Sequence, residues 1–278
     1  IWMSGRKRVF QWKSLSIIMA AVVVGVIWWQ FGGSDSEHTS DDSTVPRDTS
    51  IVPRAVSRYE NTNLAVEFVG SSACILCHAE ENESFQRTAH ARALQEVELA
   101  TEPPDAEFRH AKSGLSYRVY RKGNRLWHKE SIRADDGAEL TLANYAMRYA
   151  IGSGRFSRSY LVEADGFLIE SPVTWYSSRD EWAMSPGYDA PQHFGFERIA
   201  DVGCLVCHVG NIGSKKGNSF RAVIHEGAVG CESCHGPGSL HVKRRTNEET
   251  VFDGPDYSIV HPKRLTRERR EDVCANCH

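Results

Sequence analysis

Apolar and polar residues are distributed unevenly along the first part of the chain. An uncharged, mostly apolar run extends from Ser14 to Ser34 and follows a flank with four Lys or Arg residues. A membrane span needs about 20 largely apolar residues, and a basic flank keeps its end of the span in the cytoplasm. A cleaved signal segment is the alternative, but the run ends in the bulky pair Trp28 and Trp29, a poor cleavage site. We therefore expect residues 1–31 to form an uncleaved membrane anchor.

The next segment, residues 32–62, is polar and contains few large apolar side chains. Such a segment cannot bury enough surface to fold alone. We expect it to be a flexible linker that leads into a folded domain over residues 63–278.

Strict alternation of apolar and polar residues appears in the middle of this domain. Residues 115–121 and 125–130 alternate around a short turn that contains Gly, and residues 157–164 and 167–175 do so around an Asp-Gly turn. Alternation on both sides of such a turn is typical of a β-hairpin. The sequence therefore predicts a small antiparallel β insert over about residues 101–201.

Helical periodicity is found on both sides of the insert. Apolar residues between Ser72 and Leu99 recur at helical spacing, which predicts a helix there. Near the other end, Pro262 suits the first position of a helix that would run into Cys274.

The chain contains eight cysteines, all in four copies of Cys-x-x-Cys-His, which we number in chain order as Cys74–His78, Cys204–His208, Cys231–His235 and Cys274–His278. Residues three apart in a helical turn point the same way. The two thiols can therefore reach the two vinyl groups of one porphyrin, and the histidine can bind the iron. Zinc sites, disulfides and redox-active cysteine pairs are alternatives, but none explains a histidine directly after every pair. The pattern indicates four covalently attached haem c groups.

This interpretation fixes two sets of candidate residues. The expected haem attachment points are Cys74, Cys77, Cys204, Cys207, Cys231, Cys234, Cys274 and Cys277. The expected proximal iron ligands are His78, His208, His235 and His278. Because three motifs fall after residue 203, little conventional core fits there, and porphyrins would supply much of the interior. We therefore expect a mainly α multihaem cytochrome fold with little regular core around the haems, a small antiparallel β insert and an N-terminal transmembrane helix.

The distal iron ligands decide what each haem does, because a second histidine closes the iron and an open position admits a substrate. His225 lies six residues before the third motif and His241 six residues after it, and His90 lies on the helix predicted for the first motif. We expect these three to bind iron. His193 is the best remaining candidate, whereas His261, directly before a proline, is a weaker one.

The net charge of the chain limits the kind of partner that it can bind. The formal net charge is −3. Residues 32–278 carry −7, because the first 31 residues contribute four basic side chains and no acidic ones. An acidic exported domain is a poor candidate for nucleic-acid binding.

Haem c is attached outside the bacterial cytoplasmic membrane. We expect a single-pass protein of the inner membrane with its haem domain in the periplasm.

Two stretches of the chain resemble the cytochrome c-552/4-type multihaem cytochromes. They are residues 84–91, Ser-Phe-Gln-Arg-Thr-Ala-His-Ala, and the run from His225 through Cys-Glu-Ser-Cys-His-Gly-Pro-Gly-Ser-Leu-His to Val242. Two segments of the insert, 152–166 and 175–188, are similar to those of membrane-anchored tetrahaem members. The resemblance covers about residues 67–278. It implies closely stacked haems, mostly bis-histidine, that pass electrons in the periplasm, and it supports His90, His225 and His241 as distal ligands.

The chain ends on His278, an expected iron ligand, and begins at Ile1. A fraying terminus is a poor place for a ligand, so we expect the native protein to continue past this point.

Three functions compete at this stage. The first, which we favour, is a non-enzymatic electron carrier that accepts electrons from a quinol-oxidising membrane protein or a periplasmic cytochrome. The second is a redox enzyme with one open haem iron that acts on a small nitrogen or sulfur species, with Arg155, Arg158 or Tyr160 in its pocket. The third uses the β insert as a docking platform for a partner.

Overall fold

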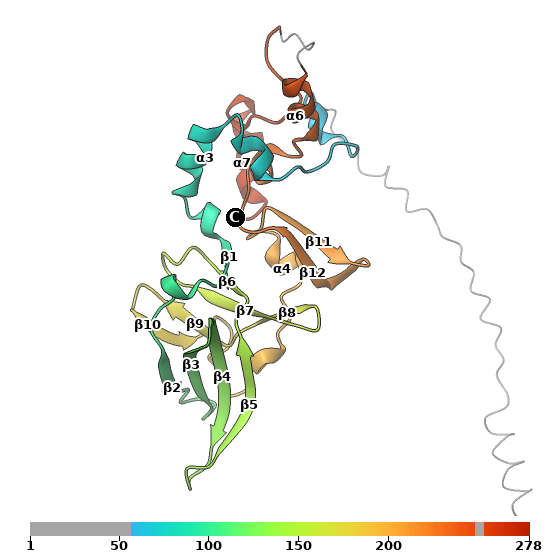
Figure 1. The fold of residues 1–278 in the computed structure, drawn as a ribbon. Coiled ribbons are helices and arrows are strands. Elements are labelled where there is room, and N and C mark those ends of the chain that lie inside the picture. Colours follow the sequence, from blue (N-terminus) through green and yellow to red (C-terminus); the bar gives the residue numbers. More distant parts are fainter. Residues whose placement is uncertain (1–56, 248–252) are drawn as a thin grey trace, which may run out of the picture. The chain divides into compact units, whose positions relative to one another are not determined.

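The computed structural model describes residues 57–247 and 253–278 (Figure 1). Residues from Val56 onward form one compact unit. The expected anchor, residues 1–31, and most of the expected linker lie outside the described residues. Within the described ranges, no helix is long and apolar enough to cross a membrane.

Two four-stranded antiparallel sheets form the middle of the chain. The first, in the order β2-β3-β4-β5, contains β2 (Ala106–Arg109), β3 (Ser116–Lys122), β4 (Arg125–Arg133) and β5 (Glu139–Ala146). The second, in the order β1-β6-β7-β8, contains β1 (Leu94–Glu96), β6 (Tyr149–Ile151), β7 (Ser159–Ala164) and β8 (Phe167–Glu170).

Two separate hairpins complete the strands of the described chain. They are β9 (Val173–Tyr176) with β10 (Glu181–Met184), and β11 (Asn211–Lys215) with β12 (Asn218–Glu226). The second pair follows the second motif directly and leads into the third. It was not predicted from the sequence.

The two hairpins expected from alternation are confirmed. Strands β3 and β4 pair up to Lys122 and Arg125, which leaves a two-residue turn. Strands β7 and β8 are joined by Asp165 and Gly166, whose φ angles are 51° and 78°. Positive φ at both turn positions gives a twist that matches that of the strands, which explains why an Asp-Gly pair is found there.

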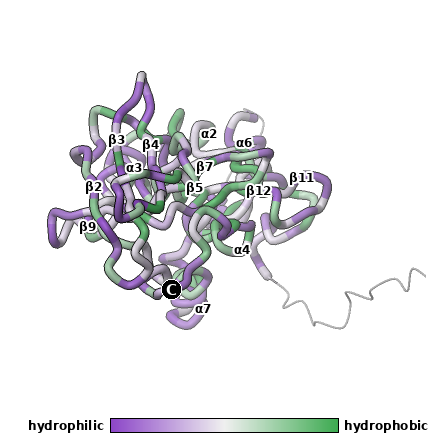
Figure 2. Tube along the Cα trace, turned by 90° about the horizontal axis from the view of Figure 1, so that it is seen from below, coloured by the Kyte–Doolittle hydropathy of each residue, from purple (hydrophilic) through white to green (hydrophobic). Residues whose placement is uncertain are grey.

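The apolar core lies among these strands. Its larger cluster includes the fully buried Tyr117, Leu126 and Tyr160 together with Trp182. His128 also lies inside it, fully buried, with Nδ1 bonded to Ser171 at 2.8 Å. Burial lowers the pKa of His128 to about 3, so the ring is neutral near pH 7. Figure 2 shows hydrophobic (green) segments among the strands and hydrophilic (purple) ones at α7 and the outer loops.

The helices are short. They are α2 (Ser71–Ile75), α3 (Ala79–Gln86), α4 (Val202–Leu205), α5 (Glu232–His235), α6 (Ser239–Thr246) and α7 (Arg267–Ala275). Single 3₁₀ turns occur at Glu60–Thr62, His90–Arg92, Leu99–Thr101, Gly195–Glu197 and Pro262–Arg264.

The prediction of a mainly α fold is therefore wrong. Strands account for 31% and helices for 24% of the structure that is described, and its strands form four sheets. The helices are little more than turns around the cysteine motifs, whereas the segment between the first and second motifs contains most of the strands and the larger core cluster. The helical spacing in the flanking segments was real but too short-ranged to give long helices.

Two helix boundaries also differ from those expected. The segment 72–99 is not one helix, because His78 has φ −120° and ψ 48° between α2 and α3 and because residues 94–96 pair with β6. Pro262 begins a 3₁₀ turn, and the helix that reaches Cys274 begins at Arg267, after Thr266, whose side chain accepts from the Arg269 N–H. An N-terminal cap of this kind fixes where a helix starts.

Candidate metal centres

Each cysteine motif is a tight helical turn, and three of the four motifs share its geometry. In the first, third and fourth motifs the histidine N–H donates to the carbonyl of the first cysteine at 3.0–3.1 Å. In the second motif the His208 N–H donates instead to the Leu205 carbonyl at 2.8 Å. All eight cysteines are free of disulfide bonds, so their thiols are available for thioether bonds.

The histidines of three motifs each face a second histidine from another part of the chain. The ring centres are 6.4 Å apart for His78 and His241, 6.1 Å for His278 and His90, and 6.3 Å for His235 and His261. Two iron–nitrogen bonds of about 2 Å each, with the distance from each nitrogen to its ring centre added, separate two axial imidazoles by about 6 Å. The three pairs therefore fit bis-histidine ligation of three haem irons.

Two of these histidines have Nδ1 engaged in a way that leaves Nε2 for a metal. His235 Nδ1 lies 2.8 Å from the Val260 carbonyl oxygen, and His241 Nδ1 lies 3.0 Å from Asp256 Oδ2. Metal-bound histidines commonly donate their other N–H to a carbonyl or carboxylate, which fixes the tautomer and the ring orientation. The same pattern here supports iron ligation by His235 and His241.

Asp256 is held firmly beside His241. Its Oδ1 accepts from the Ser258 N–H at 2.8 Å and from the Ser258 hydroxyl, and its Oδ2 accepts from Arg245 at 2.6 and 2.9 Å. Burial alone would raise the pKa of Asp256, but the hydrogen bonds from Ser258 and Arg245 hold it well below its usual range. The group that orients His241 is therefore a carboxylate, not a carboxylic acid.

The motifs adopt an order in space that differs from their order in the chain. Contacts or electrostatic interactions between cysteines link the first motif with the third, the third with the fourth and the fourth with the second: Cys74 with Cys231, Cys234 with Cys274, and Cys277 with Cys207. Burial, followed by the charge of the neighbouring thiol, raises the pKa of Cys74 to about 11. The four attachment points thus form a continuous series, first–third–fourth–second.

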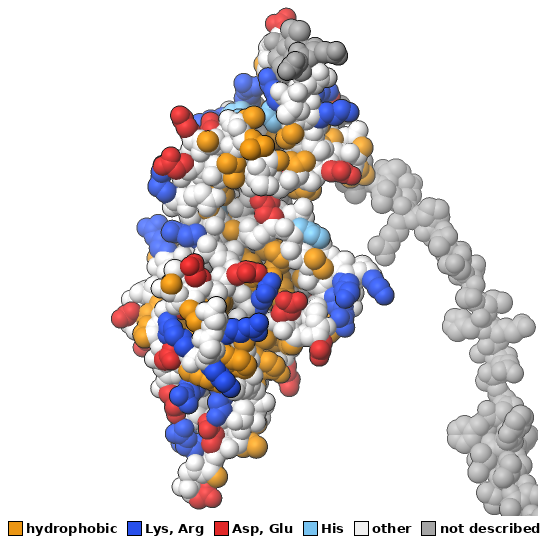
Figure 3. All heavy atoms as spheres, in the orientation of Figure 1, with side chains coloured by type: hydrophobic (Ala, Val, Ile, Leu, Met, Phe, Trp, Pro, Cys, Tyr) orange, Lys and Arg blue, Asp and Glu red, His pale blue; other side chains and the backbone are white. Residues whose placement is uncertain are grey.

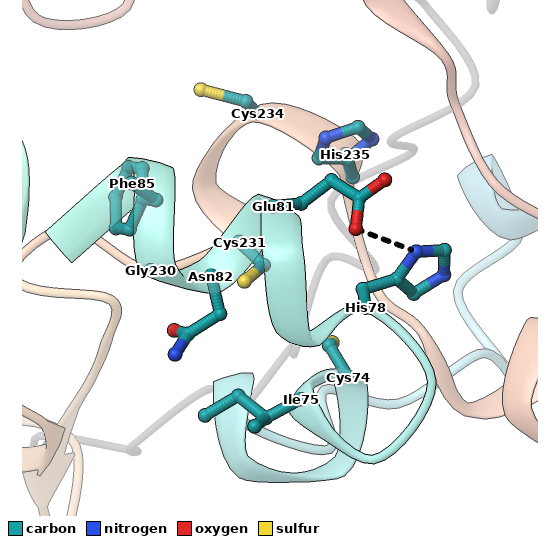
Figure 4. Close-up of a pocket in the computed structure, with 10 residues that line it drawn as sticks. All are labelled: Cys74, Ile75, His78, Glu81, Asn82, Phe85, Gly230, Cys231, Cys234 and His235. Atoms are coloured by element: carbon teal, nitrogen blue, oxygen red, sulfur yellow. Dashed lines mark ion pairs between the residues drawn. The ribbon is translucent and has the colours of Figure 1, made fainter.

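A cavity lies between the first and third motifs (Figure 4). Its volume is about 270 Å³, just below the about 300–1,000 Å³ that is usual for ligand and cofactor sites. Helix α3 supplies Glu81, Asn82 and Phe85 to its lining, and the turn of the third motif supplies Cys231 and Cys234. A space lined by cysteines and histidines of two motifs is suited to part of a porphyrin.

A buried carboxylate holds the first and third motifs together without any cofactor. Glu232, inside the third motif, is 2% exposed and accepts from the N–H groups of Val69, Gly70 and Gly238 at 2.7–3.2 Å. Several backbone donors to one anion make a strong set of hydrogen bonds. Glu226 adds a second link, since its Oε1 accepts from the Ser71 N–H at 3.0 Å.

Apolar side chains are exposed close to the motifs. Leu76 inside the first motif is 86% exposed and Val206 inside the second is 50% exposed, and Phe68 near the first motif is also exposed. Figure 3 shows apolar side chains on the part of the surface that contains α3 and α6 and also over the strands, with charged side chains scattered over both parts. Porphyrin faces would cover such side chains, so the surface chemistry as well as the histidine spacing fits haem.

The described residues contain no group of three or more His, Cys, Asp or Glu side chains arranged to hold a metal ion. The histidines instead come in pairs, the number of protein ligands that a closed haem iron takes. With the paired thiols and the cavity, the donor set fits haem c.

Of the expected distal ligands, the structure brings His90 and His241 to proximal histidines and places His225 elsewhere. His225 lies on β12 with an exposed side chain, and its Nε2 is 2.8 Å from the position that a Cβ on Gly213 would occupy. Its ring therefore lies over the adjacent strand. Among the described residues, no histidine ring faces His208 as in the other three pairs.

His193 is used within the β region. Its Nδ1 accepts from the Gly195 N–H at 3.1 Å, and its Nε2 lies 3.0 Å from the Tyr117 hydroxyl, which donates to Glu130. With both ring nitrogens engaged, His193 presents none to an iron in this arrangement. Arg158 and Tyr160, suggested for a substrate pocket, both bond to Glu102 instead.

The sequence analysis gives His261 less weight as a candidate ligand because a proline follows it. In the structure its ring faces that of His235. That proline restricts the backbone of His261 to an extended conformation, φ −115° and ψ 102°, and does not prevent its side chain from facing the third motif. The useful signal was its position between the third and fourth motifs, where few other histidines are present.

Two segments of the chain, residues 73–118 and 181–236, match the family model described as cytochrome c554 and c-prime. They contain the first three motifs, and most of the strands between them fall outside the match. The match supports a c-type cytochrome. Cytochromes of this type carry covalently bound haem c, which agrees with the cofactor expected from the motifs.

The solved structure of the outer cell wall cytochrome OcwA is similar to this chain with a TM-score of 0.41 and 17% sequence identity. The similarity covers 68% of this chain and 35% of the other, so the chain spans about a third of the length of OcwA. No curated protein matches the chain.

The pairing of His235 with His261 makes a testable prediction. His261→Ala removes one axial imidazole, so one ferric haem should change from low spin to high spin. Low-temperature EPR of the air-oxidised cytochrome, with haem content measured in parallel, checks this. His193→Ala is the matched control and should leave every haem signal unchanged. A new high-spin signal from the control but not from His261→Ala would contradict the pairing.

Proposed function

We propose that this cytochrome transfers electrons through four covalently bound haem c groups, three of them held by two histidines each. The observation that carries the proposal is the continuous first–third–fourth–second series of attachment points, combined with the three histidine pairs. When bound, each haem iron accepts and releases one electron.

The residues around the pairs support a relay more than catalysis. An iron held by the two histidines of one pair would have no site left for a substrate. The Val260 carbonyl and the Asp256 carboxylate each hold one ring in place, so the ligands need little reorganisation when the charge on the iron changes. The exposed leucine and valine inside the first and second motifs would lie against porphyrin and exclude water there.

The series predicts which haem can be removed without breaking the relay. Removing the fourth attachment site with Cys274→Ala and Cys277→Ala should separate the second motif from the rest. Removing the second site with Cys204→Ala and Cys207→Ala takes away only an end. In stopped-flow reduction, the first variant should show a slow phase for the isolated haem, and the second should reduce its three haems as fast as the parent. Equal kinetics in the two variants, each with three haems by pyridine haemochrome assay, would count against the series.

A second candidate function is favoured by the second motif alone. Its backbone turn differs from that of the other three, and within the described part of the chain His208 lacks the ring partner that the other proximal histidines have. An iron held there by one imidazole would have an open position for a small nitrogen or sulfur species. Carbon monoxide added to the reduced cytochrome should then shift the Soret band of one haem, and His208→Ala should abolish that shift. A parent spectrum that carbon monoxide does not change would remove this candidate.

We propose further that the haem domain works in the periplasm, tethered to the inner membrane by residues 1–31, and that its redox partner is a quinol-oxidising membrane protein or a periplasmic cytochrome. The uncharged run from Ser14 to Ser34 with its basic flank supports the tether, and covalent haem supports the compartment. An anchored protein should stay in the membrane pellet after alkaline carbonate washing, and a variant that lacks residues 1–31 behind a cleavable signal peptide should be released. Recovery of the parent in the soluble fraction would overturn the tether.

A further inference from the structure

The three histidine pairs differ in two respects that affect an iron between them. The ring planes of His78 and His241 are inclined by 28°, whereas those of the other two pairs are inclined by 80° and 82°. The pair of the first motif is also the one whose distal histidine donates to a carboxylate. In the third motif, by contrast, His235 donates to a neutral backbone carbonyl.

The carboxylate acts directly on the ligand. Asp256 Oδ2 lies 3.0 Å from His241 Nδ1, and the two side chains are only 12% and 20% exposed, so water screens their interaction weakly. Accepting the Nδ1 proton gives the imidazole partial imidazolate character, which makes it a stronger donor to iron. A stronger donor stabilises the ferric form and lowers the reduction potential.

Other charges near the site modify this effect without reversing it. Arg245 shares the same carboxylate oxygen, so part of the negative charge is neutralised, but the hydrogen bond to His241 remains. Glu81 lies 3.8 Å from His78 Nδ1. That distance is too long for a hydrogen bond, and water screens the charge of the exposed Glu81 side chain. This negative charge also lowers the reduction potential, but only weakly. Glu232 lies close to cysteines of both the first and third motifs and therefore does not distinguish them.

The small inclination between the ring planes of His78 and His241 also lowers the reduction potential of an iron between them. Nearly parallel axial imidazoles interact with the same iron d orbital, which favours the ferric state and gives a rhombic low-spin EPR signal. Nearly perpendicular imidazoles interact with two orbitals equally, which gives a strongly anisotropic signal with a large g value and a higher potential. The two kinds of EPR signal therefore separate the first-motif pair from the other two.

We propose that Asp256 makes the first-motif centre the lowest in potential of the three bis-histidine centres, and that electrons enter the cytochrome there. This inference rests on the proposed function, because it requires a haem at each pair. The first motif stands at one end of the series of attachment points, so electrons entering there move toward the higher-potential centres of the third and fourth motifs. Asp256 is a positioning residue that acts through His241.

An EPR-monitored redox titration of the full-length cytochrome tests this without any mutation. As the potential is lowered, the rhombic signal should be the last of the low-spin ferric signals to disappear. His241→Ala should remove the rhombic signal, which checks its assignment. A rhombic signal that disappears at or above the potential of the large-g signals would overturn the inference.

Asp256→Asn supplies the second arm of the experiment. Asparagine keeps the size and the acceptor oxygen but removes the charge. It should change the oxidised-to-reduced equilibrium of the rhombic signal by about tenfold in favour of the reduced form, an upward shift of about 59 mV for one electron. The large-g signals should not move. Asp189→Asn is the matched control, since Asp189 also bonds to a histidine, His110, but in the β region, and it should leave all potentials unchanged.

This inference rests on the proposed function, and a measurement of haem content distinguishes failure of one from failure of the other. Fewer than four haems in the parent by pyridine haemochrome assay would count against the proposed function itself. With four haems present, an Asp256→Asn variant whose rhombic signal keeps its potential would overturn the role of Asp256 alone. If that variant does not fold, the order of potentials in the parent still decides where electrons enter.

Discussion

Three pairs of histidine rings that face each other across the chain organise the helical part of the molecule. The pairs join residues far apart in the chain, such as His78 with His241 and His90 with His278. Helices α2, α3, α6 and α7 have no buried residues of their own. Their positions therefore depend on polar links such as those of Glu232, and bound haem would add covalent links of the kind that small domains use where a core is lacking. The strands are different, since both apolar core clusters are built mainly from residues on or beside them.

This difference between the helices and the strands explains which features could be predicted from the sequence. The cysteine motifs and the hairpins at β3–β4 and β7–β8 depend on residues within a few positions of each other, such as Asp165 and Gly166, and local chemistry determines them. The fold class could not be obtained in this way. Helical spacing over residues 72–99 was correct for α2 and α3, but the pairing of β1 with β6 across more than fifty residues converts its end into a strand.

Ligand pairing lies beyond sequence reasoning for the same reason. Equal six-residue spacing made His225 and His241 look equivalent, yet one ring lies over Gly213 on a strand and the other faces His78. The ring of His235 in the third motif faces His261 instead. Spacing along the chain predicts where a side chain points only within one helix or strand, and His241 and His261 each lie on a different element from the motif histidine that they face. The spatial order of the motifs depends on the same long-range contacts.

That order gives the cytochrome two unlike ends. At one end the first motif has nearly parallel imidazoles and a carboxylate on its distal ligand. At the other end the second motif has a different backbone turn and, in the described chain, no facing histidine. The two inner pairs are alike, with ring planes at 80° and 82°. A series of identical centres would carry electrons equally well in either direction. Differences confined to the ends would give such a series a direction while the inner centres stay matched. Here those differences are the Asp256 carboxylate and the 28° ring inclination at one end and, within the described residues, a His208 that no second histidine ring faces at the other.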